Sequence, residues 1–244
     1  MLYYLAQYRE LFSAFNLFQY ITFRAGGAFL TSLGMCLWWG PRFIDFLKKL
    51  KMGQSIREYG PQTHLKKAGT PTMGGVMIVG AILFATFLWA RPDNRFVLLV
   101  AATMLYMALL GFFDDYRKWL LKHPAGGLSR LFKLGAQLLL ALGVGAYLYR
   151  WPPNDLFAHD LMVPFVKNLP IPLGGAALLL AVLVIVGSSN AVNLTDGLDG
   201  LASGTLLVSA LSFAIFAYLA GHARLSHYLR IVPVPGAGEL TVLL

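Results

Sequence analysis

Charged residues are scarce in this chain and make up 13% of its 244 residues. Soluble domains carry about 25% charged residues, so this composition excludes an ordinary soluble fold. The apolar excess falls into blocks of about 18 to 23 residues, the length that crosses a bilayer as a helix. The chain is therefore predicted to be an all-α, polytopic helical membrane protein.

Cysteine is nearly absent as well. Cys36 is the single cysteine, so no disulfide can form within the chain. The first twenty residues lack the basic leader and short apolar core of a cleaved signal peptide. We expect residues 1–17 to form an interfacial helical segment that leads into the first span.

The apolar blocks predict six complete spans within one integral-membrane domain, 1–244. These spans are expected at about 18–40, 73–90, 96–113, 131–149, 173–190 and 201–220. A seventh span is expected to begin near Gly238 and to be truncated at Leu244, because seven residues cannot cross a bilayer.

Basic residues predict the orientation of these spans. The stretches 41–72 and 114–133 hold 12 of the 20 basic residues, whereas the other loops hold pairs. By the positive-inside rule the basic stretches are cytoplasmic and the N-terminus is outside. The net charge of +9 is then explained by the membrane, and no nucleic acid is expected as a partner. Alternation along the chain makes 41–72, 114–130 and 191–200 cytoplasmic loops, which are expected to form the site.

The first polar cluster, KKAGTPTMGG at 66–75, precedes the second span. It offers two lysines, the hydroxyls of Thr70 and Thr72, and two glycines that allow close backbone approach. Such a segment at a helix N-terminus suits an anionic oxygen. The alternative is a positively charged anchor followed by a helix start with a proline cap.

The second cluster, GFFDDYRK at 111–118, holds two adjacent aspartates at the inner end of the third span. Adjacent residues on a helix diverge by about 100°, so Asp114 and Asp115 are not expected to face one point. Neighbouring carboxylates raise each other's proton affinity, which suits one of them to general-base work. The alternative is a solvated helix end with Arg117 and Lys118 as partners.

The third cluster is NAVNLTDGLDGLA at 190–202. Its polar residues recur every three positions: Asn190, Asn193, Asp196 and Asp199. On a helix this spacing places neighbouring members close to one face. Gly197 and Gly200 make an interrupted helix as reasonable as a continuous one. The alternative is a polar turn between two spans.

Carboxylate and amide oxygens are hard ligands that suit Mg²⁺, which takes one or two carboxylates and completes its shell with water and phosphate. Acidic clusters alone would repel a phosphorylated substrate, but the same face also carries cations. These are Lys66, Lys67, Lys118, Lys122, Arg130 and Lys133. The combination points to phosphoryl-group chemistry at the cytoplasmic surface.

The motifs TPTMGG, GFFDDYRK and NAVNLTDGLDGLA, in this order, resemble those of the bacterial phospho-N-acetylmuramoyl-pentapeptide transferases. These enzymes belong to the polyprenyl-phosphate N-acetylhexosamine-1-phosphate transferase superfamily (glycosyltransferase family 4). The resemblance extends to AGEL at 237–240. It implies transfer of phospho-MurNAc-pentapeptide from UDP-MurNAc-pentapeptide to undecaprenyl phosphate, giving lipid I and UMP, with Mg²⁺. It also implies a homodimer in the bacterial inner membrane with its active site facing the cytoplasm.

The resemblance also implies residue roles. Asp114 or Asp115 would deprotonate or orient the lipid phosphate, and Lys67 and Thr72 would contact the uridine-diphosphate end. The nucleotide and metal pocket would include Asn193, Asp196 and Asp199. The charge pattern, independently of the resemblance, makes Lys118 and Lys133 candidates for binding substrate phosphate. Asp115 and Asp196 are the candidate Mg²⁺ ligands within this chain.

This chain departs from the family's pattern in length. The family runs to about ten spans and uses a further Mg²⁺-binding aspartate and a histidine-rich motif, both beyond Leu244. A chain ending here is expected to have an incomplete active site. The alternatives are a related UDP-GlcNAc:polyprenyl-phosphate GlcNAc-1-phosphate transferase, a secondary transporter or a non-catalytic membrane scaffold. Against the transporter, each polar cluster lies at the cytoplasmic boundary and no predicted span carries an acid at mid-membrane.

Overall fold

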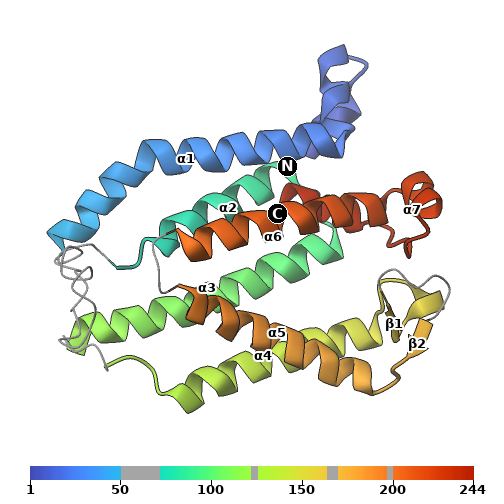
Figure 1. The fold of residues 1–244 in the computed structure, drawn as a ribbon. Helices are drawn as coiled ribbons and strands as arrows, with labels where there is room; N and C mark the ends of the chain where they lie inside the picture. Colours follow the sequence, from blue (N-terminus) through green and yellow to red (C-terminus); the bar gives the residue numbers. More distant parts are fainter. Residues whose placement is uncertain (51–71, 122–125, 164–169, 197–199) are drawn as a thin grey trace.

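The computed structural model describes residues 1–50, 72–121, 126–163, 170–196 and 200–244. Its framework is a set of long helices that run back and forth along one direction (Figure 1). They are α1 (Ile21–Lys49), α2 (Gly75–Trp89), α3 (Arg95–Leu121), α4 (Arg130–Arg150), α5 (Ala176–Thr195) and α6 (Leu201–Gly221). Each helix corresponds to one predicted span, which confirms the helical membrane class.

Among the described residues, four of these helices are long and apolar enough to cross a membrane: α3, α4, α5 and α6. By length and composition, α1 and α2 do not meet this criterion, so four of the six predicted spans do. The apolar helix α2 has 15 residues and extends about 22 Å at 1.5 Å per residue, short of a hydrocarbon core of about 30 Å. Met73, with a φ of 72°, lies outside the helical region and delays the start of α2.

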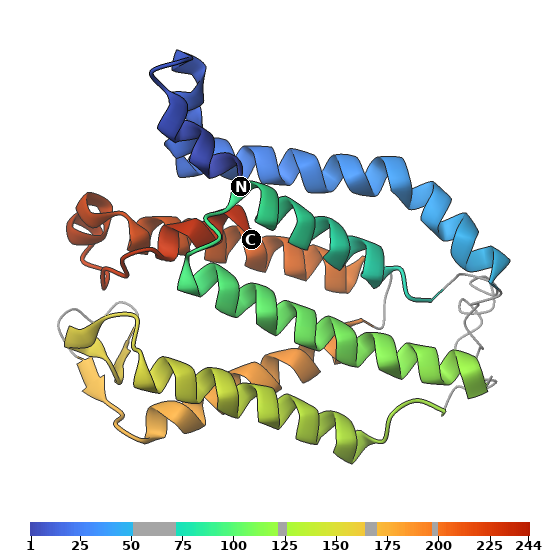
Figure 2. The same ribbon diagram turned by 180° about the vertical axis from the view of Figure 1, so that it is seen from behind.

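The described parts of the three polar clusters lie at helix ends, at one end of the molecule. The C-terminal ends of α1, α3 and α5 and the starts of α2, α4 and α6 all lie at this end, on the left in Figure 1 and on the right in Figure 2. We call it the clustered end. The described helix ends of the three clusters thus lie together, as the alternation of the spans predicts. Which side of the membrane this end faces stays a prediction.

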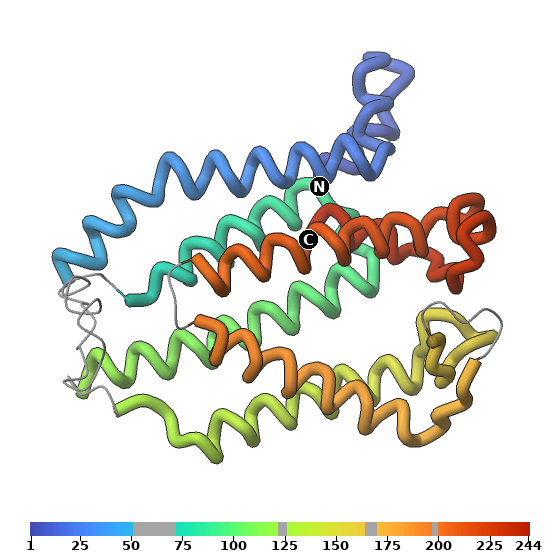
Figure 3. Tube along the Cα trace, in the orientation of Figure 1, coloured from blue at the N-terminus to red at the C-terminus, as the bar shows by residue number. Residues whose placement is uncertain are grey.

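Short elements occupy the opposite end, as the tube view shows (Figure 3). The N-terminal segment forms two 3-10 helices, η1 (Leu2–Tyr8) and η2 (Ser13–Gln19), and α7 (Ala223–Leu229) follows α6. The proline-rich loop after α4 contains η4 (Asp155–Phe157) and an antiparallel pair of strands, β1 (Asp160–Met162) and β2 (Pro170–Pro172). The sequence did not predict this hairpin.

Three helix boundaries near the polar clusters differ from the prediction. Helix α1 continues to Lys49, through the first residues of the predicted loop 41–72. Residues 114–121 continue α3 and are not part of a loop, because Lys118 pairs with carboxylates one turn earlier and stabilises the helix there. Helix α5 ends at Thr195 and α6 begins at Leu201. Gly200 has a φ of 82°, a conformation that glycine adopts without strain, so the interrupted helix is the observed form.

Buried apolar side chains form a separate cluster at each end. Near the polar clusters, Leu47 of α1 and Met73 are buried, and Phe43, Phe112 and Trp119 pack against them. This packing joins the end of α1, the start of α2 and the end of α3. Other apolar side chains, such as Leu183 of α5 and Phe213 of α6, are exposed, as expected for lipid-facing helices.

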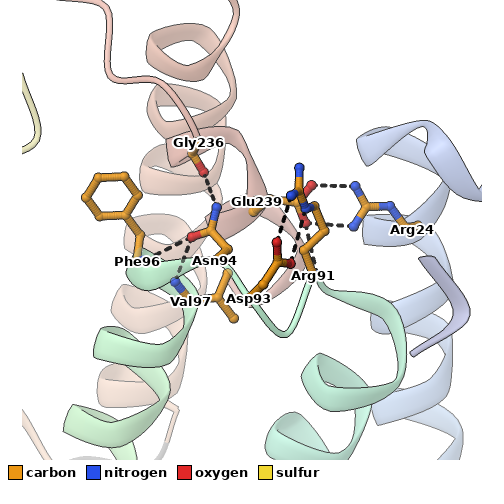
Figure 4. A network of polar contacts seen from close by, with 8 residues as sticks. All are labelled: Arg24, Arg91, Asp93, Asn94, Phe96, Val97, Gly236 and Glu239. Carbon is orange, nitrogen blue, oxygen red and sulfur yellow. Dashed lines mark hydrogen bonds and ion pairs between the residues drawn. The ribbon is translucent and has the colours of Figure 1, made fainter. Parts of the chain in front are cut away.

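A buried ion pair joins the first helix to the last residues of the chain. Arg24 of α1 and Glu239 of η5 (Ala237–Val242) are 1% and 5% exposed. The guanidinium donates to both carboxylate oxygens, with Nη1–Oε2 at 2.7 Å and Nη2–Oε1 at 2.5 Å (Figure 4). Glu239 also accepts the Arg91 N–H at 3.2 Å. The expectation that a seventh span begins near Gly238 stays a prediction, since 237–242 form a 3-10 helix here.

The loop between α2 and α3 extends this network (Figure 4). Asn94 donates to the Gly236 carbonyl at 2.9 Å and accepts the N–H groups of Phe96 and Val97. The Arg91 side chain hydrogen-bonds Asp93 and lowers the pKa of that exposed carboxyl. The network holds together segments that are far apart in sequence, at the end opposite the polar clusters.

Candidate active site

Asp114 is a buried carboxylate with three donors. It is 7% exposed and lies about two turns before the end of α3. Its Oδ1 accepts from Lys133 Nζ of α4 at 2.8 Å and from the Leu128 N–H at 2.7 Å. Its Oδ2 is 2.6 Å from Lys118 Nζ. Both oxygens are therefore engaged, and the side chain connects α3 to the start of α4.

Asp115 has a different environment. Its side chain is 38% exposed, and within the described part of the chain its one ion-pair partner is Lys118, at 3.0 Å. The predicted divergence of the two aspartates is thus seen in their burial. The expectation that the two aspartates do not face one point is corrected in one respect, because both contact the Lys118 ammonium group. Lys118 reaches both since positions three and four residues apart on a helix are neighbours.

Gly127 lies against this cluster. A Cβ atom added there would be 2.5 Å from Asp114 Oδ1 and 2.9 Å from Lys118 Cε. Neither side chain could keep its ion pair unchanged beside such an atom. The absence of a side chain at 127 lets the loop before α4 approach close enough for the Leu128 N–H to reach Asp114. Ser129 then caps α4 by accepting the Phe132 N–H.

The α5 motif reaches the clustered end as the last turns of a helix. Asn193 and Asp196 are exposed there, and Asp196 is the C-cap residue. Asn190, one turn earlier, hydrogen-bonds Gln137 of α4 at 2.8 Å. Asp199 lies outside the described residues.

The TPTMGG segment is described from Thr72 onward. Thr72 is half-buried, and the next residue, Met73, is buried in the apolar cluster formed with α1 and α3. Lys67 lies outside the described residues, so its expected contact with a uridine diphosphate stays a prediction.

The carboxylates at the clustered end are the candidate ligands for a metal ion. Among the described residues there is no group of three or more His, Cys, Asp or Glu side chains that could hold one. Asp114 does not fit as a ligand in this arrangement, because two lysines and an N–H group occupy its oxygens. Asp115 is half-exposed and Asp196 is exposed, so each of these carboxylates is open to a ligand of the kind that Mg²⁺ takes singly or in pairs.

The sequence patterns did not predict a role for Gln137, Ser189 or Gly127. Gln137 and Ser189 belong to apolar spans, and a side-chain amide within such a span was an available signal, because polar groups there are costly unless paired. Gly127 carried no comparable signal. Its role depends on the approach of the loop to Asp114, which sequence spacing does not reveal.

The fold and the clustered end together define a multi-pass membrane protein whose lysine–aspartate pairs, with the α5 motif, suit a phosphorylated ligand. The chain belongs to glycosyl transferase family 4, whose model matches residues 95–238. Signature 1 of phospho-N-acetylmuramoyl-pentapeptide-transferase matches residues 67–79, which include TPTMGG. The resemblance drawn from the motifs is thereby confirmed.

Two curated relatives are similar over nearly the whole chain. A phospho-N-acetylmuramoyl-pentapeptide-transferase of Endomicrobium trichonymphae is 50% identical over 235 residues, covering 96% of this chain and 65% of that protein. One of Desulfotalea psychrophila is 46% identical over 231 residues, covering 95% of this chain and 63% of that protein. The chain thus spans a little under two thirds of the length of these relatives. The transporter and scaffold alternatives are not favoured.

Proposed function

We propose that this protein transfers phospho-MurNAc-pentapeptide from UDP-MurNAc-pentapeptide to undecaprenyl phosphate, giving lipid I and UMP. The observation that carries the proposal is the lysine–aspartate cluster of α3 and α4 at the same end as the α5 motif, in a chain of glycosyl transferase family 4. The names of its relatives support the choice of sugar over UDP-GlcNAc.

In this proposal the two aspartates have different roles. Asp115, being half-exposed, takes up a proton from the lipid phosphate or orients it. Asp114, being buried and saturated, holds Lys118 and Lys133 in place. An oxygen of the lipid phosphate attacks the phosphorus that carries the sugar. The bond from that phosphorus to the UMP oxygen breaks, and UMP leaves with the bonding electrons.

The lysines serve the phosphates in the same proposal. Their ammonium groups are fixed by carboxylates before substrate binds, so little reorganisation is needed when negative charge develops on the departing UMP. Asn193 and Asp196 at the end of α5, with Asp199, Lys67 and Thr72, belong to the pocket for the nucleotide and the metal.

Magnesium would be held by Asp115 and Asp196, together with ligands from water and substrate phosphate. When bound it supplies charge neutralisation on the diphosphate. We further propose that the clustered end faces the cytoplasm of a bacterial inner membrane, because its described residues include Lys48, Lys49, Lys118, Arg130 and Lys133. A homodimer is proposed from the resemblance alone.

The proposal is tested with Asp115→Asn in the protein expressed from its complete reading frame. UMP release from UDP-MurNAc-pentapeptide with undecaprenyl phosphate should fall by about 10²- to 10⁴-fold, the range for a lost general base. Asp93→Asn, which removes an exposed carboxylate at the opposite end, is the matched control and should keep its rate. Chelation of Mg²⁺ should stop the reaction. A near-normal rate of UMP release in Asp115→Asn would show that Asp115 has no role in the mechanism. Turnover of UDP-GlcNAc in place of UDP-MurNAc-pentapeptide would contradict the proposed substrate.

A further inference from the structure

A polar contact ties α4 to α5 near the clustered end. The two helices pack against each other and cross in both ribbon views (Figures 1 and 2). Asn190 Nδ2 donates to Gln137 Oε1 at 2.8 Å, and Gln137 Nε2 donates to Ser189 Oγ at 3.2 Å. One side-chain amide of α4 therefore engages two successive residues of α5. Such a two-point contact fixes both the rotation of α5 about its axis and its position along α4.

The same amide lies between two parts of the proposed site. Gln137 follows Lys133 by four residues, so both side chains lie on one face of α4. Lys133 binds Asp114 of α3 at 2.8 Å. On α5, Asn190 precedes Asn193 by three residues and therefore lies one turn before it. Successive turns of α4 thus hold the aspartate pair of α3 and the polar end of α5.

The rest of the α4–α5 interface offers less directional contact. The two helices also lie close together at Gly145, where an added Cβ would be 2.7 Å from Leu178 Cδ1 and 3.4 Å from the Ala181 Cβ. Small residues let helices come close in a membrane, but apolar contacts between them tolerate sliding and rotation. The amide contact favours one register because a shift of α5 by one residue would move the Asn190 amide away from the Gln137 oxygen that it binds.

We infer that Gln137 is a positioning residue that sets the polar end of α5 against the aspartates of α3, a role that nothing in the motifs assigns to it. The inference rests on the proposed function. Because each helix would still carry its own binding groups, loss of the contact should impair the chemical step more than the binding of the sugar nucleotide.

The kinetic test uses Gln137→Leu in the protein expressed from its complete reading frame. We expect kcat to fall between about 10-fold and 100-fold, as for a displacement on the order of an ångström, with KM for UDP-MurNAc-pentapeptide nearly unchanged. The double variant Gln137→Asn with Asn190→Gln keeps the combined length of the two amides and should recover most of kcat.

The matched control is Tyr106→Phe, which removes another hydrogen bond between helices, from Tyr106 of α3 to the Ala136 carbonyl at 3.1 Å. It should leave kcat near that of the unchanged protein. An equal loss of kcat in Tyr106→Phe and Gln137→Leu, or no recovery in the double variant, would overturn the inference.

A distance measurement separates this inference from the proposed function. Spin labels on Arg117→Cys of α3 and Val192→Cys of α5, with Cys36→Ala, should give a narrow distance distribution. That distribution should broaden or shift in Gln137→Leu and narrow again in the double variant. An unchanged distribution in Gln137→Leu overturns the positioning role. Absence of UMP release from the unchanged protein would overturn the proposed function while the distances still decide the role of Gln137.

Discussion

Replacing Glu239 by glutamine should strongly destabilise the protein without changing its chemistry. The substitution keeps the shape of the side chain but removes the charge that faces the Arg24 guanidinium. Arg24 is 1% exposed, so water cannot take over the role of the carboxylate. Besides the neutral amide, Arg24 would keep two uncharged partners: the Trp89 carbonyl, at 3.2 Å from Nη1, and the Tyr3 ring, whose centroid is 4.9 Å from Cζ.

The expected size of the effect follows from this burial. Removing one partner of a buried ion pair costs about 3–5 kcal/mol, because the other charge stays buried and uncompensated. For a chain of 244 residues, about 2–4 °C is lost per kcal/mol, so the melting temperature should fall by about 6–20 °C. The double variant Arg24→Met with Glu239→Leu should recover most of this loss, since apolar replacements of buried pairs are often neutral.

Thermal unfolding of purified variants in one detergent measures these shifts. Asp93→Asn is the control, because its exposed pair with Arg91 should contribute little. The kcat of folded Glu239→Gln should match that of the unchanged protein, since the pair lies at the end opposite the proposed site. A melting temperature within about 2 °C of the unchanged protein would refute the reasoning, because the structure would then tolerate a buried, unpaired guanidinium.

Two further predictions concern the clustered end and the orientation. Gly127→Ala should lower UMP release by at least about 10-fold, because its Cβ would lie 2.5 Å from Asp114 Oδ1 and displace the group that holds both lysines. The control is Gly174→Ala, where the added Cβ meets no atom within 4 Å but the backbone φ of 51° is strained for alanine. This variant should retain more activity, and equal rates of UMP release in the two variants would contradict the role of Gly127. A reporter inserted at 155–160 should be detected on the side of the membrane opposite the cytoplasm, and a cytoplasmic signal would invert the proposed orientation.

The sequence alone determined the class of fold and the location of the polar clusters. Long apolar blocks require helices in a bilayer, because every backbone polar group must be satisfied within the segment. Alternation of those helices then places the stretches around Thr72, Asp114 and Asp196 at one end. The motifs at these stretches also sufficed to indicate the family.

The tertiary structure decided how the side chains at this end differ. Asp114 and Asp115 are equivalent in sequence, yet Lys133 and the Leu128 N–H reach the first, and the second is half-exposed. That difference depends on which face of α3 packs against α4. The hydropathy pattern does not reveal this face, because α3 is apolar on most sides.

Pairings between distant residues were likewise invisible in the sequence. Arg24 and Glu239 are 215 positions apart, and Gln137 and Asn190 are 53 apart. A local pattern reports the neighbours of a residue along its own helix, whereas these contacts depend on which helices lie side by side. The sequence therefore placed the candidate site at one end of the bundle, and only the packing of α3, α4 and α5 distinguished the groups that hold it together from those exposed to a substrate.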